Sequence, residues 1–181
     1  MNGSCYVAFL RGINVGRAKR IAMADLRALV EGLGYTGVRS LLNSGNLVFR
    51  AAGVTAQEAA RAIEEALALR LGVAARVFVL GREELGAIIE GSPLLDVATD
   101  HARLIVFLLD AAAQRDRLAA LDGRDWGCER LALGERAAYV WCPEGMLLSA
   151  AATSLGKLLG DGTTSRNWNT LLKLHALCGA A

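Results

Sequence analysis

Three short segments of this chain are apolar at nearly every position: residues 5–10, 104–109 and 137–142. A strand with one face in solvent alternates apolar and polar side chains, because successive side chains point to opposite faces of the sheet. We therefore expect three strands that are covered on both faces. Helices would cover one face, and the second half of the chain, the last helices or a partner chain would cover the other. This pattern argues against an open sheet used as a binding platform.

Strand and helix patterns follow one another along the first 81 residues in the order βαββαβ. Strands are expected at residues 5–10, 38–42, 47–51 and 75–80. One helix is expected from Met23 to Leu33, and a second helix opens on a Thr55–Glu58 capping box and ends at Gly72. This order is that of the ferredoxin-like split unit.

The second half of the chain repeats most of this order. The patterns predict a strand at residues 103–109, a helix ending near residue 121, a hairpin of residues 131–133 and 137–142, and helices at 154–159 and 166–178. We therefore predict an α+β protein with two ferredoxin-like halves, βαββαβ followed by βαββα, and C-terminal helices. The expected boundaries are residues 1–81 and 103–181, with residues 82–102 connecting them.

Composition and cysteine usage exclude several classes of protein. The net charge of +2 is too small to indicate a nucleic-acid or membrane partner. The cysteines Cys5, Cys128, Cys142 and Cys178 include no Cys-x-x-Cys pair, and only two histidines are present, so no zinc-type spacing exists. No apolar run approaches the ~18 residues of a membrane span. We expect a cytoplasmic protein with reduced cysteines, no metal and no cofactor.

The most charged segment is Arg-Gly-Ile-Asn-Val-Gly-Arg-Ala-Lys-Arg at residues 11–20, between the first strand and the first helix. It carries four cations and two glycines, and no acid occurs in the first twenty residues. In a βαββαβ unit the first two strands run parallel, with the third antiparallel strand between them. Their C-terminal ends therefore lie at the same edge, and we expect residues 11–20 to meet the Asn43–Asn46 turn there.

Polar, cationic and glycine residues of these segments and of the C-terminal region form the candidate ligand site. The candidates are Arg11, Gly12, Asn14, Gly16, Arg17, Lys19, Ser44, Gly45, Asn46, Arg166 and Asn167. Glycines allow positive φ and close approach of the backbone, and amides at a helix start attract anions. Arg166 is expected in the first turn of the last helix, capped by Thr164 or Ser165. A cation is unfavourable there unless it faces an acid, a carbonyl or a ligand anion. A phosphate or carboxylate cradle and a purely structural, solvated turn both fit the loop.

Common catalytic motifs are absent from the sequence. It has no P-loop, no Gly-x-Gly-x-x-Gly dinucleotide fingerprint and no Gly-x-Ser-x-Gly elbow, and no pair of carboxylates stands out for acid–base chemistry. The leading hypothesis is binding of a small anion, a nucleotide or a nucleic-acid phosphate. The alternatives are a transferase acting on a phosphorylated small molecule and a structural interaction module, monomeric or homodimeric. Catalytic residues are unassigned, and no membrane partner is expected.

Four strings carry a family resemblance: residues 6–16 (YVAFLRGINVG), 23–27 (MADLR), 43–49 (NSGNLVF) and 164–170 (TSRNWNT). In this order they resemble the domain-of-unknown-function family 1697 over nearly the whole chain. The resemblance implies a compact α+β protein of bacterial type with two ferredoxin-like halves. It implies no established activity, cofactor or catalytic residue. Family members often have a glycine and a lysine after Asn-Val-Gly, whereas this chain has Arg17-Ala18-Lys19. The charge is kept, and some backbone freedom is lost.

Overall fold

The computed structural model describes residues 3–111 and 113–180, which form two compact units. The first unit comprises Met1–Leu85 together with Lys173–Ala181, and the second comprises Gly86–Leu172. The last residues of the chain thus group with the first unit, whereas the boundaries expected from the sequence kept all of residues 103–181 together. Each unit has a four-stranded antiparallel sheet of its own.

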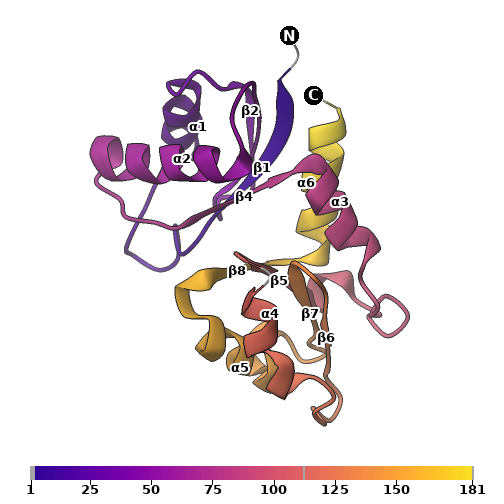
Figure 1. Cartoon of the computed structure of the whole chain (residues 1–181). Coiled ribbons are helices and arrows are strands. Elements are labelled where there is room, and N and C mark those ends of the chain that lie inside the picture. The colour runs from indigo at the N-terminus through magenta and orange to yellow at the C-terminus, as the bar shows by residue number, and fades with distance from the viewer. Residues whose placement is uncertain (1–2, 112, 181) are drawn as a thin grey trace. The chain divides into compact units, whose positions relative to one another are not determined.

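The first unit is a βαββαβ fold, as the sequence predicts. Its elements are β1 (Ser4–Leu10), α1 (Met23–Glu31), β2 (Thr36–Leu41), β3 (Asn46–Ala51), α2 (Ala56–Leu71) and β4 (Val77–Gly81). The strands lie in the order β2-β3-β1-β4, with β1 antiparallel to both β3 and β4. Helices α1 and α2 lie on the same face of this sheet (Figure 1).

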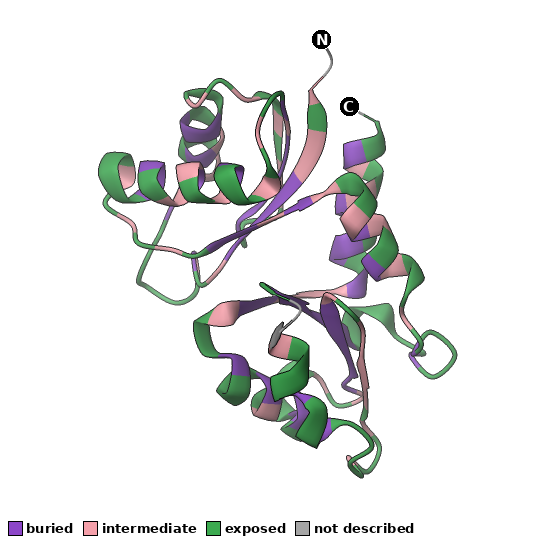
Figure 2. Cartoon of the chain, viewed as in Figure 1, coloured by how far each residue is buried: buried purple, intermediate pink, exposed green. Residues whose placement is uncertain are grey.

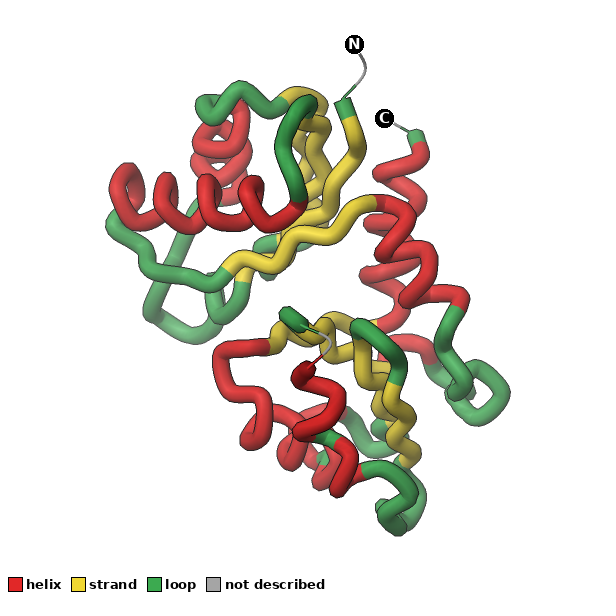
Figure 3. The backbone as a smooth tube through the Cα atoms, in the orientation of Figure 1, coloured by secondary structure: helices red, strands yellow, loops and turns green. Residues whose placement is uncertain are grey.

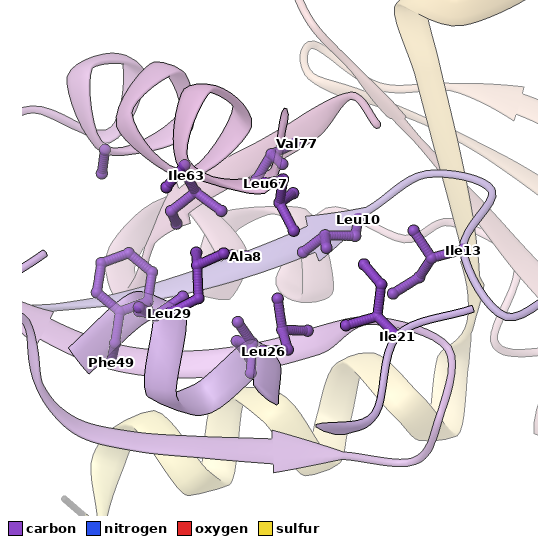
Figure 4. Packing of buried hydrophobic residues seen from close by; sticks show 14 of the residues in the cluster. Ala8, Leu10, Ile13, Ile21, Leu26, Leu29, Phe49, Ile63, Leu67 and Val77 are labelled. Atoms are coloured by element: carbon purple, nitrogen blue, oxygen red, sulfur yellow. The ribbon is translucent and has the colours of Figure 1, made fainter. Parts of the chain in front are cut away.

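The core of the first unit lies between this sheet face and the two helices. Ala8 and Leu10 of β1 pack in one buried cluster with Leu26 of α1 and with Ile63 and Leu67 of α2 (Figure 4). The alternate residues of the same strand, Val7 and Phe9, point to the other face and are also fully buried. Burial on both faces of β1 is what its apolar sequence predicts.

The start of α2 has the expected capping box. The Glu58 amide donates to Thr55 Oγ1 at 3.2 Å, and the Thr55 amide donates to Glu58 Oε2 at 2.7 Å. These two bonds satisfy backbone donors that a helix start otherwise leaves unpaired. The bonds that Glu58 accepts from Thr55 hold the pKa of its carboxyl below the ordinary value.

The second unit is a second βαββαβ fold. Its elements are β5 (Leu104–Leu109), α4 (Ala113–Arg117), β6 (Arg130–Leu133), β7 (Ala137–Trp141), α5 (Ala150–Leu159) and β8 (Thr163–Asn167). The strand order β6-β7-β5-β8 matches that of the first sheet. Strands β5 and β7 are buried along their whole length (Figure 2). Two further helices, α3 (Arg82–Glu90) and α6 (Trp168–Gly179), contribute residues to both units.

Strand β8 corrects the sequence analysis, which ended the second half without a closing strand and placed Arg166 in a helix. Residues 163–167 pair with β5, with Arg166 opposite Val106, and α6 starts only at Trp168 (Figure 3). Threonine favours strands because its β-branched side chain packs well against neighbours, but threonine and serine also favour helix caps. The local pattern fits both conformations, and the strand partner that decides between them lies about sixty residues earlier in the chain.

A disulfide joins Cys5 of β1 to Cys178 of α6, within the first unit, with Cα atoms 5.8 Å apart. The expectation that Cys5 is a reduced, hydrophobe-like cysteine is therefore wrong. Cys128 and Cys142 are free thiols, the former exposed and the latter buried. Among the described residues, no helix has both the length and the apolar character needed to cross a membrane.

Candidate functional site

The ends of β1 and β2 meet as the topology predicts. The Leu10 amide at the end of β1 donates to the carbonyl of Gly45 at 2.8 Å. The Asn14 side chain, four residues further on, donates to the carbonyl of Asn43 at 2.7 Å. The segment of residues 11–20, called the basic loop below, therefore lies against the Asn43–Asn46 turn.

Asn14 holds the basic loop in shape. Its Nδ2 donates to the carbonyl of Ile21 at 2.9 Å as well as to Asn43, and its Oδ1 accepts from the Ile21 amide at 2.8 Å. Its own amide donates to the carbonyl of Lys19 at 3.1 Å. Asn14 has φ 55°, a left-handed conformation that asparagine tolerates better than most residues. Both polar ends of the Asn14 side chain are thus engaged within the protein, where they fix the backbone of the loop.

Two isoleucines anchor the loop on either side of its tip. Ile13 and Ile21 are exposed by only 1% and 7% and belong to the core cluster of the first unit. Figure 4 shows both side chains beyond the end of β1, next to Leu10. Residues 15–20 between these anchors are all exposed. The basic loop is thus an exposed tip on a buried base.

The exposed tip carries uncompensated positive charge. The side chains of Arg17 and Lys19 are exposed and have no hydrogen bond or ion pair with any described residue. Arg20 differs, because its Nη2 donates to the carbonyl of Gly16 at 2.8 Å and so folds back on the loop. Arg11 is half-buried at the base of the loop, where its amide donates to the Arg76 carbonyl at 2.9 Å.

Most of the Asn43–Asn46 turn opposite the loop is buried or packed against the base of the loop. Gly45 has φ 80° and packs closely, since a Cβ built on it would lie 2.8 Å from both Leu10 Cβ and Ile13 Cδ1. Asn46 is fully buried, and its Nδ2 donates to the Leu41 carbonyl at 3.0 Å and to Ser44 Oγ at 2.9 Å. Ser44 itself is exposed. Of the turn residues among the candidates, only Ser44 is therefore accessible to a ligand.

The start of α1 adds backbone donors next to the loop. Its N-cap residue Ala22 makes no side-chain cap, so the amides of the first helical turn have no capping oxygen from that residue. Such amides attract anions together with the helix dipole. Asp25 in the same turn partly opposes this attraction. The accessible candidates are accordingly Gly12, Gly16, Arg17, Lys19 and Ser44.

Arg166 and Asn167 belong to the second unit and have structural partners there. Arg166 Nη1 donates to Thr164 Oγ1 at 2.8 Å and to the Ser165 carbonyl at 2.7 Å, and burial lowers the pKa of its guanidinium to about 10. Asn167 Oδ1 accepts from the amide and the hydroxyl of Thr170, at 2.9 and 2.8 Å. Asn167 therefore caps α6, and the expected cap by Thr164 or Ser165 is wrong.

Among the described residues, no group of three or more histidine, cysteine, aspartate and glutamate side chains is arranged to hold a metal ion. Sequence reasoning missed two contributors to the site. Ile21 and Asn43 supply the backbone groups that Asn14 binds. The one sequence signal for these contacts was Asn14 itself, which lies between Gly12 and Gly16 in a pattern that favours left-handed backbone.

Comparisons with known proteins agree with this architecture. A comparison with curated proteins finds no match. Among solved structures, the conserved bacterial protein SP0830 from Streptococcus pneumoniae is similar, with a TM-score of 0.79 and 25% sequence identity, over 97% of this chain and 98% of that one. The family model described as "Protein of unknown function (DUF1697)" matches residues 4–139, which include the basic loop and the turn. The chain belongs to this DUF1697 family.

Proposed function

We propose that the basic loop binds the phosphate group of a small phosphorylated molecule, such as a nucleotide. The observation that carries the proposal is that Arg17 and Lys19 project from a braced loop and have no acidic partner among the described residues. Charge-assisted bonds from such cations to phosphate oxygens are roughly twice as strong as neutral hydrogen bonds. Ser44 supplies a hydroxyl on the adjoining turn.

The brace around Asn14 supports this function energetically. Ordering a mobile loop on binding costs about 0.5–1.5 kcal/mol for each immobilised long side chain, and more for the backbone. Here three hydrogen bonds from the Asn14 side chain and two buried isoleucines already fix the loop backbone. Only the side chains of Arg17 and Lys19 must become ordered when an anion binds.

The test compares two pairs of charge reversals. The site variant is Arg17→Glu with Lys19→Glu. The matched control is Arg115→Glu with Lys157→Glu, two exposed cations of the second unit, which changes the net charge by the same amount. Binding of inorganic phosphate, pyrophosphate and adenosine 5′-monophosphate is measured by isothermal titration and thermal shift.

We expect the site variant to bind these probes at least tenfold more weakly than the control, since each lost charge-assisted bond is worth about 1.5–3 kcal/mol. Equal binding by both variants and the unmodified protein would refute the proposal. A single-stranded oligonucleotide is titrated in parallel over a range of salt concentrations. If it alone binds, with affinity falling steeply as salt rises, the ligand is a nucleic-acid backbone instead.

The cytoplasm is the location that we propose with this function. Cys128 is exposed and free, and it lines a small pocket with the buried free thiol of Cys142. Proteins of oxidising compartments usually carry their cysteines in disulfides. A disulfide in a reducing compartment, such as that of Cys5 and Cys178, is usually transient or redox-sensing.

A further inference from the structure

A polar groove of about 480 Å³ lies at the end of β1 away from the basic loop. The start of β1, the start of α3 and the end of α6 line it, and all its lining residues belong to the first unit. In Figure 1 the start of β1, in indigo, and the end of α6, in yellow, are the two segments that the disulfide joins. Both Cys5 and Cys178 line the groove, so the disulfide forms part of its wall.

Arg50 lies directly across from one of the two disulfide cysteines. Cys5 pairs with Arg50 in the register of β1 and β3. Residues opposite each other in antiparallel strands share a face, with Cβ atoms about 4.5–5.5 Å apart. Arg50 Nη1 donates to the Gly3 carbonyl at 3.0 Å, which keeps the guanidinium at the start of β1. Arg50 also lines the groove.

A second cation lies beside the other cysteine. The guanidinium of Arg82 packs against Gly179, the residue after Cys178, since a Cβ built on Gly179 would lie 2.9 Å from Arg82 Nη2 and 3.4 Å from its Cζ. The side chain of Arg82 is exposed and has no hydrogen bond or ion pair with any described residue. Glu83 is the one carboxylate among the residues that line the groove, so positive charge is in excess there.

We propose that this groove is a thiol–disulfide exchange site for small thiols that carry a carboxylate. Disulfides are opened by thiolates, and neighbouring arginines favour both the incoming anion and the thiolate that leaves. Cys5 is half-buried, whereas Cys178 is only 2% exposed, so Cys5 is the more accessible cysteine and the one that the incoming thiol attacks. Arg82 binds the carboxylate of the incoming thiol. Arg50 stabilises the Cys5 thiolate that the second step of the exchange releases.

The exchange takes place in two steps. The first thiolate bonds to Cys5 Sγ, the Cys5–Cys178 bond breaks, and its electron pair leaves on Cys178 Sγ, which takes a proton from water. A second thiolate then attacks the sulfur of the attached thiol. This step releases the small-molecule disulfide and the Cys5 thiolate. Two small thiols are oxidised, the protein disulfide is reduced, and the last turn of α6 is no longer tied to β1.

The test measures how fast three thiols of similar size open the disulfide of the full chain. They are anionic 3-mercaptopropionate, neutral 2-mercaptoethanol and cationic cysteamine, with rates expressed per thiolate at low salt. Samples are quenched with acid and alkylated, and the modified cysteines are identified by peptide mass. The variants are Arg82→Gln and, as a matched control, Arg115→Gln in α4.

We expect the anionic thiol to react at least threefold faster than the cationic one with the unmodified chain and with the Arg115 variant. The Arg82 variant should lose this preference, and the trapped mixed disulfide should be on Cys5. Three results would each overturn the proposal: the same rate order in all three proteins, a mixed disulfide on Cys178, or a rate that does not rise with thiol concentration. The last result would mean that the disulfide opens only when the protein unfolds. The reverse reaction gives a further check. If the disulfide form of 3-mercaptopropionate did not convert reduced Cys5 and Cys178 back to their disulfide, the proposal would be overturned as well.

Discussion

Replacing Gly45 with alanine tests the contact between the turn and the basic loop. Gly45 has φ 80°, and an alanine Cβ would lie 2.8 Å from Leu10 Cβ and 2.8 Å from Ile13 Cδ1. Real Cβ atoms essentially never approach other heavy atoms so closely. The substitution therefore combines an unfavourable backbone conformation with a steric conflict at the buried base of the loop.

The expected loss of stability is the sum of two terms. A left-handed residue other than glycine costs about 1–2 kcal/mol, and overpacking a buried site costs about 1–3 kcal/mol. Gly45→Ala should therefore lower the free energy of unfolding of the first unit by about 2–5 kcal/mol. Gly53→Ala is the matched control, because Gly53 has φ 69° and its added Cβ would have no neighbour within 4 Å. It should show the backbone term alone.

Hydrogen–deuterium exchange followed by peptide mass spectrometry measures this difference where it arises. The peptide that contains the Leu10 amide, which binds the Gly45 carbonyl, should exchange faster in Gly45→Ala than in Gly53→Ala by the factor that 1–3 kcal/mol implies, about 5- to 150-fold. The three tryptophans, Trp126, Trp141 and Trp168, all lie in the second unit, so their fluorescence during urea unfolding serves as an internal control. Equal exchange in the two variants would refute the packing argument.

Two further predictions concern the disulfide and a buried tyrosine. Because Cys5 and Cys178 are 173 residues apart, the loop-entropy relation gives a stabilisation of about 5 kcal/mol at most. A Cys5→Ala, Cys178→Ala double variant should lose up to this amount in urea unfolding, and an unchanged unfolding midpoint would contradict it. Tyr139 donates to the Ile88 carbonyl at 2.6 Å, and burial raises its pKa to about 12. The unfolded chain ionises this tyrosine near its ordinary value of about 10. The folded state is therefore penalised as pH rises from about 10 towards 12. The free energy of unfolding should fall less steeply over that range in Tyr139→Phe, and identical slopes in a urea series would count against this assignment.

Connectivity explains why so much of the first unit follows from its sequence. The order of strand and helix patterns along the chain determines the order of strands in the sheet. That strand order in turn brings the basic loop next to the Asn43–Asn46 turn. The capping box at Thr55 depends on residues three positions apart. Both features are local or topological, and neither requires knowledge of a distant packing partner.

Features decided by distant partners were not predictable in the same way. Residues 163–167 became a strand because β5 pairs with them, and Cys5 entered a disulfide because Cys178 comes beside it. Among the candidate site residues, Asn46 proved to be buried support, and Arg166 has partners within its own strand. Polar residue types indicate hydrogen bonding, but only the fold decides whether the partner is a ligand or the protein's own backbone.

The division of the chain into units has a consequence for its synthesis. The second unit, Gly86–Leu172, is one uninterrupted stretch, whereas the first also needs Lys173–Ala181. Chains leave the ribosome from the N-terminus, and domains generally fold as they emerge. The second unit is therefore complete before the first unit, which still lacks the nine residues Lys173–Ala181 at that point. The bond between Cys5 and Cys178 can form only after residue 178 has been synthesised, so every chain that carries it already contains the complete second unit.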